Sequence, residues 1–148
     1  MDISRIRALR GPNLWSRHTA IEAIVTCSEA ERALTTLPDF EPRLRALFPA
    51  LGPLRRQPDQ ASLAHVLELA TLALQIQAGC PVTFSRTTET VERNTFQVVV
   101  QYSEEEVGRK ALAAAEGLVQ AVLAGGSFDV AATIAELREL DEDIRLGP

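Results

Sequence analysis

The clearest strand in the sequence is Thr95-Phe96-Gln97-Val98-Val99-Val100-Gln101-Tyr102. Aromatic and β-branched side chains dominate it, and such residues suit the half-buried surface of a sheet. Ser103 and Glu106 follow at the S-x-x-E spacing of a capping box, which predicts a helix from there to about Ala124. Gly125 and Gly126 would end that helix. A strand followed at once by a long helix predicts that both kinds of element share one core.

Further elements are expected on both sides of this pair. Residues 3–10 and 19–25 have the period-two alternation of strands, and the second run places Ile21, Ala23 and Val25 on one face. The remaining expected elements are a short strand at 81–84 followed by a polar connection at 85–93, and helices at 41–47, 59–78 and 129–143. Asp59 is the expected N-cap of the long middle helix, and Gly79 its end.

This order of elements predicts an α+β fold. Two hairpins can pair into one antiparallel sheet of about four strands, with the helices packed on one face. The chain has 148 residues, which suits one domain. We expect residues 1–143 to form that domain and residues 144–148 to begin a linker.

Composition narrows the class of protein. Hydrophobic residues make up 46% of the chain and charged residues 24%, as in ordinary soluble proteins. No apolar run approaches the ~20 residues of a membrane span, and the charged N-terminus is unlike a signal peptide. We therefore expect a cytoplasmic protein without a membrane partner. Cys27 and Cys80 lie among apolar neighbours, so buried free thiols are expected rather than a disulfide framework.

The charges argue against a nucleic-acid partner. The net charge is −5, whereas nucleic-acid binding needs a basic surface. Residues 1–60 carry a net +2, from nine Arg against seven acidic residues. Lys110 is the one basic residue in the chain that is not Arg. The preference for Arg over Lys suits a carboxylate-bearing ligand, since Arg binds carboxylates with two parallel hydrogen bonds. A genomic bias toward Arg codons explains this preference equally well.

An incomplete zinc-peptidase pattern lies in the long middle helix. His65 and Glu68 match the first and fourth positions of H-x-x-E-H, but Leu69 stands where the second His would be. Two His residues at this spacing share one helix face and can share a metal, while the Glu can act as general base. Leucine cannot ligate, so this pattern indicates a hydrolytic ancestry without hydrolysis. The alternative is a chance pair in a helix, with a hydrogen-bonded His65 and a solvated or ion-paired Glu68.

Several segments resemble the N-terminal domain of cyanophycin synthetases. Leu9-Arg10-Gly11-Pro12-Asn13-Leu14-Trp15 is very like the L-R-G-P-N-x-W opening of that family. In chain order, the other matching segments are 84–90 with F-G-R-T-R-E-T, 96–102 with Y-Q-V-V-x-E-Y, 105–109 with E-E-x-G-R, and 146–148 with L-G-P. The resemblance covers essentially the whole chain, with Thr88 in place of an Arg of the family pattern.

The resemblance implies a part in making cyanophycin, a poly-aspartate with an arginine on each β-carboxyl. In this family an ATP-grasp domain adds Asp and a Mur-ligase-like domain adds Arg, while the N-terminal domain is understood to hold the growing polymer. In some members the H-x-x-E-H helix also cuts polymer into primers. The present chain has no G-x-x-x-x-G-K-[ST] loop, so we expect ATP and Mg to belong to other domains of a homo-oligomeric parent, and no cofactor or metal here.

Candidate polymer contacts follow from the charges of the polymer. Arg10, Arg17 and Arg86 are candidates for binding carboxylates, and Glu89 for binding guanidinium groups together with Glu92 and Glu68. Trp15 could stack on a guanidinium plane. The alternatives are structural: the arginines could tie loops together, and Trp15 could anchor the core. A residual hydrolase with a rebuilt ligand set, using His18 and Glu105 or Glu106, and a purely structural assembly domain also remain open.

Overall fold

A computed structural model describes residues 1–10 and 19–147. The elements are β1 (Asp2–Leu9), β2 (Ala20–Thr26), α1 (Phe40–Leu47), α2 (Leu63–Gln77), β3 (Ser85–Glu89), β4 (Thr95–Gln101), α3 (Glu105–Ala124) and α4 (Val130–Leu146). Three short 3₁₀ turns lie at Ala30–Arg32, Leu34–Thr36 and Pro58–Gln60. The predicted α+β class is confirmed.

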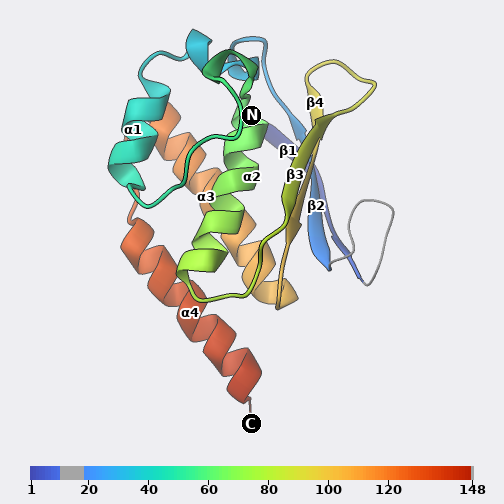
Figure 1. The fold of residues 1–148 in the computed structure, drawn as a ribbon, viewed down its shortest axis with the longest axis vertical. Coiled ribbons are helices and arrows are strands. Elements are labelled where there is room, and N and C mark those ends of the chain that lie inside the picture. The colour runs from blue at the N-terminus through green and yellow to red at the C-terminus, as the bar shows by residue number, and fades with distance from the viewer. Residues whose placement is uncertain (11–18, 148) are drawn as a thin grey trace.

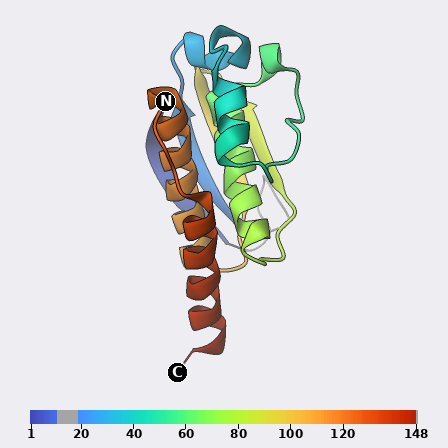
Figure 2. The same ribbon diagram turned by 90° about the vertical axis from the view of Figure 1, so that its left-hand side faces the viewer.

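The four strands form one antiparallel sheet in the order β1-β2-β4-β3. The hairpins β1–β2 and β3–β4 join through β2 and β4, where Ala23 pairs with Val98. Strands β1 and β3 are therefore the two edges. Figure 1 shows the helices gathered on one side of this sheet, as expected, and Figure 2 shows α4 extending away from it toward the C-terminus.

The core lies between the sheet and α2 and α3. The apolar side chains of β2 that the sequence places on one face, Ile21, Ala23 and Val25, are all buried in it. Helix α2 contacts β3, β4, α3 and α4, which explains why apolar residues cover most of its surface. Both cysteines are buried and free, as expected.

Gly108 allows α3 to pack closely on the sheet. A Cβ at this position would lie 2.7 Å from the Cβ of Tyr102 and 3.3 Å from Cγ1 of Ile21. Neither neighbour can move easily, because both side chains are buried. This contact places the first turn of α3 beside the ends of β2 and β4.

Three expected boundaries are wrong. Helix α2 begins at Leu63 with Ser62 as its N-cap, while Asp59 lies in a separate 3₁₀ turn. Helix α3 follows Glu104, and its start has no capping box from Ser103. The third strand is Ser85–Glu89, within the expected polar connection, rather than residues 81–84.

Other boundaries agree more closely. Helix α2 ends before Gly79, which has a φ of +94° that other residues rarely adopt. Helix α4 begins close to the expected start, with Asp129 as its N-cap, but continues to Leu146, beyond the expected end near Asp143. None of the helices in the described residues combines the length and apolar character that a membrane span needs.

Candidate functional site

His65 has a structural partner at the start of α2. The hydroxyl of Ser62 accepts hydrogen bonds from the backbone N–H groups of Ala64 and His65 at 3.1 and 3.3 Å. In return, Nδ1 of His65 accepts the backbone N–H of Ser62 at 3.1 Å. This is a capping box with histidine in the position usually held by Glu or Gln. Since Nδ1 accepts a hydrogen bond, the proton of the neutral ring resides on Nε2.

The surroundings of His65 keep its ring neutral. The ring meets Phe96 edge to face, with centroids 5.9 Å apart. Burial, assisted by the positive charge of Arg56, lowers the pKa of His65 to about 4. At neutral pH the imidazole is therefore an uncharged capping group.

Glu68 lies one turn further along α2 and is 5% exposed. Its Oε2 accepts the hydroxyl of Ser85 at 2.5 Å, and its Oε1 accepts the hydroxyl of Thr87 at 2.7 Å. The guanidinium of Arg55 lies 3.6 Å from Oε2. Both carboxylate oxygens thus join α2 to β3, and the carboxylate is ion-paired, as the structural alternative predicted.

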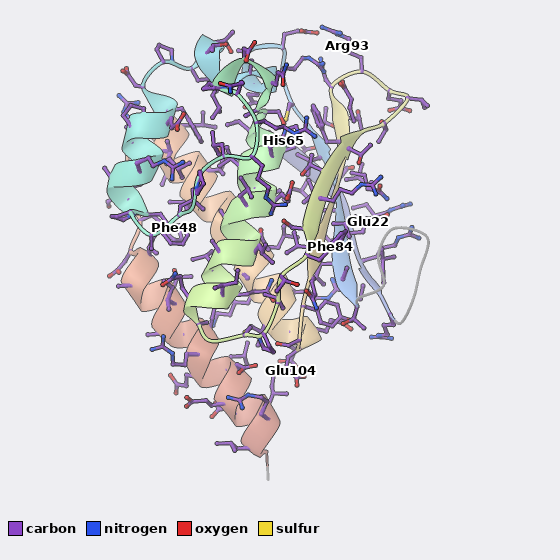
Figure 3. The ribbon with its side chains drawn as sticks, viewed as in Figure 1. Glu22, Phe48, His65, Phe84, Arg93 and Glu104 are labelled. Atoms are coloured by element: carbon purple, nitrogen blue, oxygen red, sulfur yellow. The ribbon has the colours of Figure 1, made fainter. Side chains whose placement is uncertain are left out.

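A cavity of about 550 Å³ opens beside these residues. Leu69 lines it together with His65 and Glu68, so the three positions of the incomplete pattern share one wall. The other lining residues come from the segment before α2 and from β3: Leu54, Arg55, Arg56, Gln57, Gln60, Ala61, Ser85, Arg86 and Thr87. Figure 3 shows His65 on the helix side of the sheet, with Glu22 on the opposite side.

A second cavity, of about 490 Å³, continues along β3. The two cavities share Arg56, Gln60, His65 and Thr87. We call the combined depression the β3 groove; its additional lining residues are Arg32, Ala33, Asp59, Thr88, Glu89 and Phe96. It runs between β3 and residues 54–61, and it contains four arginines and three acidic residues.

Two oppositely charged side chains in the β3 groove are open to a ligand. Arg56 and Asp59 are both exposed, and neither forms an ion pair with another described residue. The neighbouring Arg55 is less available to a ligand, because it donates a hydrogen bond to Ser85 and pairs with Glu68. Arg86 is also exposed, and its Nε donates to Oγ1 of Thr88 at 3.2 Å. The groove can therefore accept a carboxylate and a guanidinium at the same time.

Glu89 reaches the groove but already holds a guanidinium. Both of its oxygens accept from Arg32, and Oε2 also accepts the backbone N–H of Asn94 at 2.9 Å. The hydrogen bond from Arg32, followed by that from Asn94, lowers the pKa of Glu89 to about 2. This arrangement ties the β3–β4 connection to the turn at Ala30–Arg32. A polymer contact by Glu89 remains a prediction.

Arg10 does not line the β3 groove. Its Nη2 donates to Oε1 of Glu105 at 2.6 Å, which connects the end of β1 to the start of α3. Arg109 donates to the other oxygen of Glu105 at 2.9 Å. Trp15 and Arg17, and with them His18, lie outside the described residues. The structure thus places Arg86 and Glu89 on one groove and Arg10 elsewhere.

The His65 site does not suit a catalytic metal. Nδ1 of His65 accepts from Ser62, the carboxylate of Glu68 is bound by β3 and Arg55, and Leu69 offers no lone pair. Within residues 1–10 and 19–147, no three His, Cys, Asp or Glu side chains are grouped as a metal site. A zinc ion here would have to compete with hydrogen bonds that already hold α2 to β3.

Sequence reasoning missed Arg55, Arg56 and Asp59, which form the far wall of the groove. The adjacent pair Arg55-Arg56 just before the incomplete zinc-peptidase helix is a signal that could have found them. The sequence patterns also did not reveal Glu22, a buried carboxylate on the open face of the sheet. Glu22 accepts hydrogen bonds from Arg7 and Gln97, each at 2.6 Å, so its charge is locally compensated.

The sequence of the chain matches a known protein family. Residues 23–124 match the model of the cyanophycin synthase-like N-terminal domain. The chain belongs to this family. The matched range runs from β2 to the last residue of α3 and includes the whole β3 groove.

Curated relatives agree with the family. Over its whole length the chain is 34% identical to a cyanophycin synthetase of Trichormus variabilis, 32% to one of Geminocystis herdmanii and 30% to one of Synechocystis sp.. It covers 18% of the first relative and 19% of the other two. The chain therefore spans about a fifth of the length of these relatives.

Proposed function

We propose that this domain is a non-catalytic polymer-binding unit of a cyanophycin synthetase, and that the β3 groove holds the growing β-Asp-Arg polymer. The observation that carries the proposal is that Arg56 and Asp59 line the groove, are exposed and form no ion pair with another described residue. Arg86 lines the same groove. Such a mixed surface suits a ligand that carries both signs of charge.

The chemistry of the polymer supplies both signs. An arginine joined through its amino group to a β-carboxyl retains its guanidinium and its own carboxylate, so each unit is zwitterionic. Arg56 and Arg86 are placed to bind carboxylates, and Asp59 to bind a guanidinium. Each exposed contact is worth only ~0.5–1 kcal/mol, but a repetitive ligand makes several at once.

The proposal excludes polymer cleavage by this domain. The pattern residues His65 and Glu68 serve as a helix cap and as a tie to β3, and Leu69 breaks the H-x-x-E-H sequence. We infer that the site descends from a hydrolase site whose wall was kept as a binding surface. No cofactor is required for this role.

Ligation is assigned to other parts of a longer parent protein. By its resemblance, that parent contains an ATP-grasp domain and a Mur-ligase-like domain, which use ATP and Mg and act in the cytoplasm as a homo-oligomer. The domain would keep the polymer near both ligase sites between additions. Nucleic acid and membranes are not expected partners.

Titration of a soluble β-aspartyl-arginine octamer by calorimetry at low salt tests the proposal. We expect saturable heat that weakens as salt is added, because the contacts are between exposed charges. The same oligomer, incubated with the domain and added zinc, should stay intact by mass spectrometry. Flat heats at millimolar octamer would leave the domain a structural assembly unit, and zinc-dependent cleavage would make it a hydrolase.

A further inference from the structure

Strand β3 presents a free main-chain edge to the β3 groove. The N–H of Gln101 donates to the carbonyl of Phe84 at 2.9 Å, and the N–H of Thr90 donates to the carbonyl of Thr95 at 2.8 Å. In an antiparallel pair the bonded residues alternate along each strand. Arg86 and Thr88 therefore bond to β4, and the main-chain groups of Ser85, Thr87 and Glu89 point outward.

Contacts at Ser85 agree with this alternation. Nη1 of Arg55 lies 3.4 Å from the carbonyl oxygen of Ser85, on the outward side of the strand. Beyond that point, no main-chain group of residues 1–10 or 19–147 bonds to the outward N–H and C=O groups of Thr87 and Glu89. Both residues line the groove between β3 and residues 54–61, where Glu89 is exposed and Thr87 is 5% exposed.

We propose that the main chain of the polymer adds along β3 as a fifth strand, with hydrogen bonds to Thr87 and Glu89. This step rests on the proposed function and specifies how the groove holds its ligand. A poly-aspartate backbone modified only on its β-carboxyls keeps all of its main-chain amides. An extended chain can therefore pair with a sheet edge, as in other cases of strand addition.

The side chains around this edge fit an alternating ligand. Successive residues of an added strand point to opposite faces of the sheet. On the helix face they meet Arg56 and Asp59, which line the groove. On the open face they meet Arg86, because Ser85 and Thr87 on either side of it turn their hydroxyls inward to Glu68. Figure 3 shows β3 in front, at the edge of the sheet.

Amide hydrogen exchange followed by NMR tests this pairing within one strand. In the free domain we expect the amides of Thr87 and Glu89 to exchange at least about tenfold faster than those of Arg86 and Thr88, which bond to β4. With saturating octamer the two sets should become alike. Saturation with Thr87 and Glu89 still fast would overturn strand addition but leave polymer binding intact.

Two further outcomes would also overturn the pairing. If the octamer does not saturate, the proposed function fails and strand addition fails with it. If Thr87 and Glu89 are protected in the free domain in proportion to protein concentration, the edge pairs with a second copy of the chain instead.

A matched pair of variants and a modified ligand test the same hydrogen bonds. Thr87→Pro removes the outward N–H, and edge strands tolerate proline at such positions. Thr87→Val keeps that N–H but also loses the hydroxyl bond to Glu68. We expect Thr87→Pro to bind the octamer at least about fivefold more weakly than Thr87→Val does. We also expect an octamer methylated on its aspartyl backbone nitrogens to bind the unmodified domain at least about tenfold more weakly than the plain octamer does. Equal affinities for the two octamers would overturn strand addition even if Thr87→Pro does not fold.

Discussion

The hydroxyl of Ser85 lies 2.5 Å from Oε2 of Glu68. This contact joins the glutamate of the incomplete zinc-peptidase pattern to the edge strand that borders the groove. A second hydroxyl, from Thr87, satisfies the other oxygen, and Arg55 balances the charge. The residue that would be a general base in a hydrolase is here a structural connection between α2 and β3.

Replacing Glu68 by glutamine should destabilise the domain by about 1–3 kcal/mol, because one amide group cannot accept both hydroxyls and pair with Arg55 as the carboxylate does. Urea unfolding of the two proteins measures the difference. Glu139→Gln, on the exposed face of α4, is the control and should change stability little. Equal stability of Glu68→Gln and the parent would contradict the structural role.

His65 should make stability fall as the solution is acidified. Its pKa is about 4 in the folded state and near 6.5 when unfolded, so the unfolded chain binds the extra proton first. The contribution of His65 to the free energy of unfolding is fully present above pH 6.5. It is lost as the pH falls toward 4, and the loss amounts to at most about 3 kcal/mol.

A glutamine at position 65 isolates the contribution of the imidazole. Gln can serve in a capping box but does not titrate, so His65→Gln should show a shallower loss between pH 6.5 and 4 in urea unfolding. A carboxylate such as Glu29, whose pKa lies near 2, acts equally in both proteins. Parallel pH profiles would show that His65 is not held neutral by burial.

Completing the pattern with Leu69→His should not create a zinc enzyme. The new imidazole would face the cavity, but Nδ1 of His65 and both oxygens of Glu68 remain engaged. We expect less than stoichiometric zinc after dialysis, measured by elemental analysis, and no cleavage of the octamer. One zinc per chain together with cleavage would show that a single substitution had disabled the site.

Most of the architecture was predictable because its patterns are local. The alternation in β1 and β2, the β-branched run in β4 and the glycines after α2 and α3 each indicate one element. Strand β3 was missed because its inward residues, Ser85 and Thr87, are polar, and they are buried only because Glu68 lies opposite them. No local pattern reveals such a pairing between a helix and a strand.

The candidate site was predicted in part for the same reason. Motif comparison singled out His65, Glu68 and Arg86, which do line one cavity. No sequence pattern predicted the groove residues Arg55, Arg56 and Asp59, because their segment has no periodicity. Only the fold brings this segment alongside β3. The ion pairs of Arg10 with Glu105 and of Arg32 with Glu89 join residues far apart in sequence, so local patterns could not predict them.

The central claim, that the β3 groove binds the polymer, is tested most directly by calorimetry with the octamer on the double variant Arg56→Ala/Arg86→Ala. Two lost contacts of ~0.5–1 kcal/mol each predict a Kd about 5–30 times higher at low salt. The control is Arg43→Ala/Arg109→Ala, which removes the same charge outside the groove and should leave the Kd nearly unchanged. Equal affinities for the two double variants would contradict the assignment of the groove.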